Sequence, residues 1–165
     1  MASVIDVCGI EPESIVDGPG FRYVVFVQGC PHHCVGCHNP QSHPFGCGTK
    51  RTVDDLIGEM RENPLLAGVT LSGGEPFCQA EALCELAQRV REMGKTVVAY
   101  SGYTLEQLLE KGKTDPWVMR LLRLVDTLID GPYIEAERDL ELQFRGSRNQ
   151  RVIDLPAWFA EHKEA

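Results

Sequence analysis

Residues 21–37 read FRYVVFVQGCPHHCVGC, and this stretch runs from an apolar segment directly into three closely spaced cysteines. Its first part, from Phe21 to Val27, is rich in the β-branched and aromatic residues that favour strands. Gln28 and Gly29 then interrupt the apolar pattern just before Cys30. The stretch therefore predicts a buried strand whose carboxyl end carries a cysteine-rich loop.

Three more apolar runs end in the same way, in a polar motif that contains glycine. They are GVTL at 68–71 before SGGEPF, TVVAY at 96–100 before SGYT, and VDTLI at 125–129 before DGPY. Helical patterns fall between them, at residues 52–62, at 79–93, after Thr104 and at 117–124. Strands and helices that alternate at this spacing indicate parallel βαβ units.

The length of the chain decides which parallel architecture is expected. A complete eight-fold α/β barrel takes about 250 residues, whereas this chain has 165. We therefore predict an α/β fold in which residues 1–165 form a single domain, an incomplete TIM-like barrel with parallel strands. Active sites of such folds lie at the carboxyl ends of the strands, so the four polar motifs are expected to share one cleft.

Composition narrows the class of partner and the compartment. The formal net charge of −8 argues against nucleic acid as the main partner, because nucleic acid is itself a dense polyanion. The sequence has no secretory pattern at its start and no apolar run near the ~20 residues of a membrane span. Seven cysteines are an odd number, and free thiols suit a reducing compartment. We expect a cytoplasmic protein in which the dispersed Cys8, Cys47, Cys78 and Cys84 are free thiols.

Cys30, Cys34 and Cys37 form a CxxxCxxC pattern, in which three thiolates on one short loop can converge on one inorganic centre. Soft sulfur ligands favour zinc or iron–sulfur over hard cations. A zinc site would need a fourth ligand, such as His32, His33 or His38. A 4Fe–4S cluster with only three cysteines would leave one iron open for substrate chemistry. The spacing by itself leaves both alternatives.

The motif Ser72-Gly73-Gly74-Glu75-Pro76 follows the second strand-like run. Two glycines without Cβ atoms allow a ligand to approach the backbone, and the neighbouring carboxylate can anchor an ammonium or ribose group. A tight turn between strand and helix is the alternative. Its position at a strand end after CxxxCxxC strengthens the functional interpretation.

Together these motifs resemble the radical S-adenosylmethionine superfamily. The segment SIVDGPGFR at 14–22 is similar to its branch that activates glycyl radical enzymes. Three later segments resemble the subgroup that activates anaerobic ribonucleoside-triphosphate reductase: SGYT at 101–104, IDGPY at 129–133 and RGSRNQR at 145–151. The segment HNP at 38–40 is also familiar from activases of the formate-lyase type.

The resemblance implies a cofactor set and a reaction. Cys30, Cys34 and Cys37 would hold one 4Fe–4S cluster, whose open iron binds the amino and carboxylate groups of S-adenosyl-L-methionine. Reductive cleavage would yield a 5′-deoxyadenosyl radical that takes a hydrogen atom from a glycine of the partner. Expected partners are the large subunit of the anaerobic reductase and a low-potential electron donor such as flavodoxin or ferredoxin.

The same resemblance implies contacts to S-adenosylmethionine, and all of them are expected at strand ends or in the cysteine loop. The residues are Gly36, Cys37, His38, Gly73, Gly74, Glu75, Ser101 and Asp130. For Ser101 and Asp130, capping of a turn is the alternative role. Arg145, Arg148 and Arg151 form a basic cluster whose options are a solvated surface, internal ion pairs, or binding of the partner or the cofactor carboxylate. Activation of another glycyl radical enzyme and a zinc-stabilised binding module remain the rival functions.

Overall fold

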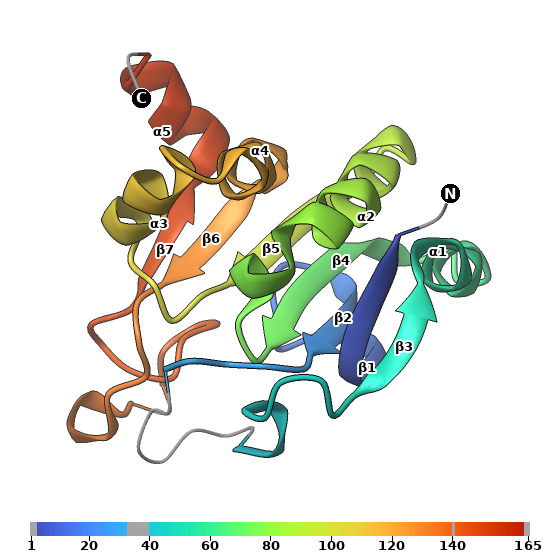
Figure 1. Cartoon of the computed structure of the whole chain (residues 1–165), viewed down its shortest axis with the longest axis horizontal. Coiled ribbons are helices and arrows are strands. Elements are labelled where there is room, and N and C mark those ends of the chain that lie inside the picture. The colour runs from blue at the N-terminus through green and yellow to red at the C-terminus, as the bar shows by residue number, and fades with distance from the viewer. Residues whose placement is uncertain (1–2, 33–39, 140, 164–165) are drawn as a thin grey trace.

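The computed structural model describes residues 3–32, 40–139 and 141–163. Within these ranges, seven strands form a single sheet in the order β3-β1-β2-β4-β5-β6-β7 (Figure 1). No helix in the described ranges is long and apolar enough to cross a membrane.

Four parallel strands form the centre of the sheet. They are β2 (Phe21–Val27), β4 (Leu66–Gly73), β5 (Thr96–Tyr100) and β6 (Thr127–Asp130), and each pairs in parallel with the next. These are the four strands that the apolar runs predicted. The expected α/β architecture, an incomplete barrel built on parallel strands, is confirmed.

Three antiparallel strands at the edges were not expected from the sequence. β1 (Val4–Ser14) pairs with β2, β3 (Thr49–Thr52) pairs with β1, and β7 (Arg151–Asp154) pairs with β6. β1 carries acidic residues and Pro12, which hide its strand character, and its register shifts between Glu11 and Ser14. Proline is tolerated at such irregularities because no ladder hydrogen bond is lost there.

The helices pack together on one face of the sheet (Figure 1). Their bounds are α1 (Val53–Arg61), α2 (Ala80–Glu92), α3 (Leu105–Gly112), α4 (Pro116–Leu124) and α5 (Leu155–Glu161). The first four match the predicted segments, and α5 was missed. Short 3₁₀ turns lie at Pro40–Ser42, Pro76–Gln79 and Glu135–Glu137. Thr104 closes a full capping box with Gln107 at the start of α3, which explains why that helix begins there.

Alternation along β2 separates the two faces of the sheet. Tyr23, Val25 and Val27 belong to the apolar core shared with the helices. On the opposite face the chain of residues 15–20 crosses the sheet. Its Asp17 carbonyl accepts a hydrogen bond of 2.7 Å from Thr70 Oγ1, and Gly18 lies against Val98. This segment is the floor of the incomplete barrel.

Arg22 ties that floor to the sheet. Its side chain is fully buried and donates to Thr70 Oγ1, Thr96 Oγ1, and the carbonyls of Pro19, Val69 and Thr96 at 2.7–3.3 Å. Burial lowers the pKa of Arg22 to about 10. The partners are neutral oxygens, so the guanidinium replaces its hydration shell with protein dipoles.

Candidate functional site

The carboxyl ends of the four parallel strands surround one cavity of about 330 Å³. Cys30 after β2, Gly73 and Gly74 at β4, Ser101 after β5, and Gly131 after β6 all line it. The loops after these strands lie on the same side of the sheet, below it in Figure 1. Parallel neighbours place their carboxyl ends at the same edge, which is why motifs far apart in the sequence meet here.

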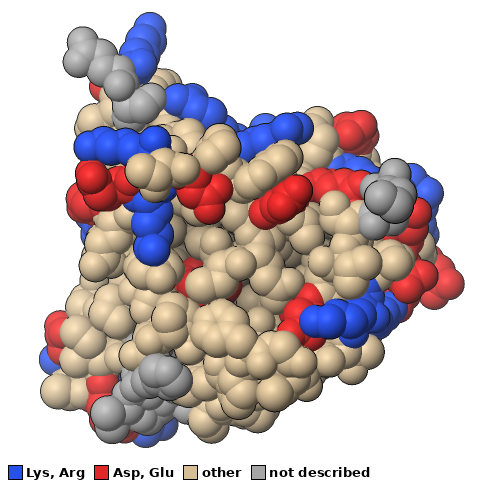
Figure 2. Space-filling view, viewed as in Figure 1, with Lys and Arg blue, Asp and Glu red and all other residues tan. Residues whose placement is uncertain are grey.

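Charge is distributed unevenly over the face seen in Figure 1. Figure 2 shows Lys, Arg, Asp and Glu side chains gathered mainly toward the helices, whereas the centre of this face is mostly uncharged. Among the residues that line the cavity, Asp17 and Arg145 carry the carboxylate and the guanidinium. Among the described lining residues, the cavity therefore has one carboxylate and one guanidinium.

The stem of the cysteine loop is fixed by hydrogen bonds between its two ends. Gly29 N donates to Ser42 O at 2.6 Å, and Cys30 N donates to His43 O at 3.0 Å. The buried Gln28 side chain adds bonds from Nε2 to Gln41 O (3.0 Å) and Pro44 O (2.6 Å). Cys30, the first residue of the CxxxCxxC pattern, is thus held in a defined position at the cavity wall.

The remaining predicted residues of that loop lie outside the described part of the chain. They are Cys34, Gly36, Cys37 and His38, all within residues 33–39. The structure therefore places one of the three expected cluster ligands. That residue, Cys30, is 8% exposed and lines the cavity.

Gly73 and Gly74 line the cavity, and the structure gives a specific reason for both glycines. A Cβ on Gly73, which has φ +93°, would lie 2.5 Å from Val27 N. A Cβ on Gly74 would lie 2.3 Å from Gly29 O. Both contacts are to backbone, which side-chain rotation cannot relieve. The missing Cβ atoms let the end of β4 pack against the stem of the cysteine loop.

Glu75 is fully buried behind the cavity wall, and its carboxylate is satisfied within the protein. Oε1 accepts from His32 Nε2 at 2.7 Å and from Gly102 N at 2.8 Å. Ser101 Oγ lies 2.9 Å from both oxygens, and Phe77 N donates to Oε2 at 3.1 Å. These bonds use the roughly four lone-pair positions of a carboxylate. The expected direct contact of Glu75 with an ammonium or ribose group stays a prediction, and such a group would have to compete with these internal donors.

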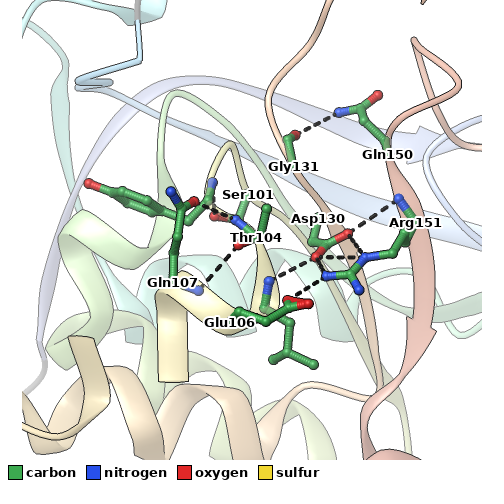
Figure 3. Close-up of polar contacts among 10 residues, drawn as sticks. Ser101, Thr104, Glu106, Gln107, Asp130, Gly131, Gln150 and Arg151 are labelled. Atoms are coloured by element: carbon green, nitrogen blue, oxygen red, sulfur yellow. Dashed lines mark hydrogen bonds and ion pairs between the residues drawn. The ribbon is translucent and has the colours of Figure 1, made fainter. Parts of the chain in front are cut away.

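The Asp130 carboxylate is likewise buried within the protein and bonded to other parts of the chain. It is 1% exposed, accepts from Leu105 N at 2.8 Å, and pairs with Arg151, whose Nε lies 3.0 Å from Oδ1 (Figure 3). Asp130 does not line the cavity. This is the capping role that the sequence left as its alternative. Ser101 lines the cavity, and its Oγ also caps the following turn by accepting from Tyr103 N at 3.0 Å.

The three arginines near the C-terminus lie in three different environments. Arg151 forms ion pairs with Asp130 and Glu106, the latter at 2.7 Å (Figure 3). Arg148 is exposed. Arg145 lines the cavity, where its Nη1 donates to Gln150 O at 3.1 Å. Arg145 Nε is buried without a hydrogen-bond partner among the described residues.

Sequence reasoning missed one wall of the cavity. Leu142, Phe144 and Gly146 line it, and Tyr100 Oη fixes this segment by donating to Phe144 O at 2.6 Å. Phe144 has φ +62°, an unfavourable conformation for a bulky residue. The sequence signal for this wall was the RGSRNQR segment, which includes Gly146 and directly follows Phe144.

Among the described residues, the dispersed cysteines form no disulfide. Cys84 is buried, Cys8 is half-buried, and Cys47 and Cys78 are exposed. Burial raises the pKa of Cys84 to about 11.

Comparison with known proteins decides the family. A family model described as a 4Fe-4S single cluster domain matches residues 16–153. The anaerobic ribonucleoside-triphosphate reductase-activating protein of Vibrio cholerae is 35% identical over 149 residues, which cover 86% of this chain and 92% of that protein. The protein of the same name from Escherichia coli K12 is 34% identical over 152 residues, covering 87% and 95%. This chain belongs to the family of anaerobic ribonucleoside-triphosphate reductase-activating proteins.

This membership confirms the family resemblance seen in the motifs, and the matched domain supports an iron–sulfur cluster. A second kind of activase is also similar. The pyruvate formate-lyase-activating enzyme of Listeria monocytogenes is 32% identical over 165 residues, which cover 94% of this chain and 63% of that enzyme. The crystal structure of QueE from Escherichia coli aligns with 61% of this chain and 53% of its own at a TM-score of 0.48 and 16% identity. The α/β fold is evident from the sheet topology of this chain.

Proposed function

We propose that this protein cleaves S-adenosylmethionine reductively and uses the resulting radical to form a glycyl radical on anaerobic ribonucleoside-triphosphate reductase. The observation that carries the proposal is the convergence of Cys30, Gly73, Gly74 and Ser101 on one cavity at the strand ends. The chain would act as a single radical S-adenosylmethionine domain in the cytoplasm. A low-potential donor such as flavodoxin or ferredoxin would supply the electron.

The described residues fit the two cofactors. The buried Cys30 thiol faces the cavity on a braced loop stem, as a ligand to an iron–sulfur cluster requires. Cys34 and Cys37 would complete the ligand set. Arg145 Nε, a buried donor without a described partner, suits a carboxylate such as that of S-adenosylmethionine. When bound and reduced by the external donor, the cluster would supply one electron to the S–C5′ bond of S-adenosylmethionine, whose cleavage would give methionine and a 5′-deoxyadenosyl radical.

The residues of this chain would hold S-adenosylmethionine and shield the radical from water. Gly73, Gly74 and Ser101 offer backbone and hydroxyl groups to the methionine end of S-adenosylmethionine, while Gly36 and His38 would approach its nucleoside. Leu142 and Phe144 form an apolar wall that excludes water from the radical. Hydrogen-atom transfer from a glycine Cα needs no general acid or base. Glu75 and Asp130 contribute through the residues they hold in place.

The decisive experiment is anaerobic incubation of the reconstituted protein with S-adenosylmethionine, a reductant and purified reductase, followed by electron paramagnetic resonance. We expect a glycyl doublet on the reductase and none with a Cys30→Ser variant. Because one similar protein is a pyruvate formate-lyase-activating enzyme, purified formate-lyase is the matched second substrate. Consumption of S-adenosylmethionine without a doublet on the reductase would refute the proposed target. A colourless protein that contains zinc and neither iron nor sulfide would refute the radical function altogether.

A further inference from the structure

The segment Gly73-Gly74-Glu75 contacts the cysteine loop at three successive points. Gly74 N donates to Val27 O at 2.8 Å, and Glu75 N donates to Gly29 O at 2.8 Å. The Glu75 carboxylate then reaches His32, two residues beyond Cys30, through the 2.7 Å contact with Nε2. One short segment at the end of β4 therefore follows the chain on both sides of the first cluster cysteine.

The position of His32 is specified by its surroundings as well as by this bond. A Cβ on Gly102 would lie 2.3 Å from His32 Cδ2, so the absence of a side chain at residue 102 makes room for the imidazole. The Tyr103 ring meets the imidazole edge-on with centroids 4.4 Å apart, and Lys111 Nζ lies 4.6 Å from the Tyr103 ring centroid. The His32 side chain is 14% exposed and the Glu75 side chain is fully buried. A loop residue with such a tailored site is held in one place.

We infer that Glu75 is a positioning residue, which holds the cysteine loop through His32 and so sets the geometry of the cluster before S-adenosylmethionine binds. This inference rests on the proposed function only in that Cys30, Cys34 and Cys37 carry a cluster. It assigns Glu75 a different task from direct contact with S-adenosylmethionine. Ser101 Oγ and Gly102 N also donate to the Glu75 carboxylate, so the loop after β5 helps to hold it in place.

The two tasks differ in what they change in the absence of S-adenosylmethionine. If the hydrogen bond between Glu75 and His32 is lost, the cysteine loop constrains the cluster less. The properties of the cluster then change even without S-adenosylmethionine. A direct ligand contact alters only the response to S-adenosylmethionine. Removing a charged hydrogen bond from a buried pair corresponds to about a tenfold effect on an equilibrium or a rate.

The test compares His32→Ala, His32→Gln, Glu75→Gln and the double variant His32→Ala/Glu75→Gln after anaerobic reconstitution. Three properties are measured without S-adenosylmethionine: the rate of iron loss to a chelator, the spectrum of the reduced cluster, and its midpoint potential. We expect His32→Ala and Glu75→Gln to lose iron about tenfold faster, with altered spectra. The double variant should lose iron no faster than either single variant, because each single change removes the charge-assisted hydrogen bond between the two side chains.

His32→Gln is the conservative rescue, because its side-chain amide keeps an N–H donor. We expect it to retain iron nearly as well as the parent protein. Glu81→Gln and His162→Gln, at exposed positions away from the cavity, are the matched controls. Circular dichroism of the apo proteins establishes that each variant is folded.

Two outcomes would overturn the inference. The first is a Glu75→Gln protein that keeps the parent spectrum and iron retention but loses the spectral change on adding S-adenosylmethionine. That result would identify a direct contact. Alternatively, His32→Gln would lose iron as fast as His32→Ala, which shows that the hydrogen bond to Glu75 is not what holds the loop. Neither result involves a partner protein, so the test is independent of whether the reductase is the target.

Discussion

Arg151 on β7 and Asp130 at the end of β6 form an ion pair in which one partner is buried and the other half exposed. Arg151 Nε lies 3.0 Å from Oδ1 and 3.2 Å from Oδ2 of Asp130, whose side chain is 1% exposed, against 48% for Arg151 (Figure 3). Asp130 also accepts from Leu105 N. The pair thus joins the last edge strand and the start of α3 to the parallel sheet.

Replacing Arg151 by leucine should leave the Asp130 carboxylate buried without its counter-charge. Fully buried pairs cost about 3–5 kcal/mol to break, and the exposure of Arg151 reduces our expectation to about 2 kcal/mol. Urea unfolding of the apo protein measures this loss. Arg148→Leu, an exposed arginine in the same segment, is the control and should change stability by less than about 0.5 kcal/mol. Equal effects of the two substitutions would contradict the role given to the pair.

Replacing Arg22 by methionine should destabilise the floor of the barrel. The change removes every hydrogen bond that the guanidinium donates to Thr70, Thr96, Pro19 and Val69. Because the acceptors stay buried, we expect a loss of about 3 kcal/mol in the free energy of unfolding. Arg61→Met, on the exposed surface of α1, is the matched control. An Arg22→Met protein as stable as this control would refute the assignment.

Two Gly→Ala substitutions should have opposite effects. At Gly73 the positive φ and the contact with Val27 N make alanine destabilising by about 2–3 kcal/mol, and iron retention should fall with it. At Gly58, in the interior of α1, a Cβ meets nothing within 4 Å, so alanine should stabilise the protein by about 0.5–1 kcal/mol. Urea midpoints of the two apo variants test both signs. A neutral Gly73→Ala would mean that the end of β4 does not pack tightly against β2.

The thiols of Cys47 and Cys84 should differ strongly in reactivity. Cys47 is exposed, whereas Cys84 is 2% exposed and burial raises its pKa to about 11. At pH 8 only about one in a thousand Cys84 thiols is ionised, and the thiolate is the reactive form. We expect iodoacetamide to modify Cys47 at least ~100-fold faster, as measured by peptide mass spectrometry. The difference should vanish in urea; a similar rate for both thiols in the folded protein would contradict this burial.

Several elements were evident from the sequence because their signals are local. Apolar runs in β2, β4, β5 and β6 are buried on both sides, so they appear as continuous hydrophobic segments rather than as alternating ones. Thr52 and Thr104 mark helix starts by their own side-chain chemistry. The edge strands lack such signals. β7 is four residues long and mostly exposed, and it exists through its pairing with β6.

The candidate site likewise has features that local sequence signals predict and features that they do not. Its location at the strand ends followed from the repeated order of strand, glycine motif and helix, since parallel strands must bring their carboxyl ends to one edge. The chemistry of CxxxCxxC was also visible, because thiolate spacing is itself a local property. Neither pattern indicates which side chains face the cavity and which face the protein.

Only the tertiary structure decides which of these side chains line the cavity. Glu75 and Asp130 both lie at strand ends in polar motifs, yet neither lines the cavity. Each carboxylate accepts hydrogen bonds from distant segments, His32 and Ser101 for Glu75 and Arg151 for Asp130. A buried carboxylate requires several donors at once, and only the folded chain brings those donors together. The sequence by itself determined the four parallel strands, the helix starts at Thr52 and Thr104, and the sheet edge where Cys30 lies. The edge strands and the direction of each carboxylate depended on contacts between segments far apart in the chain.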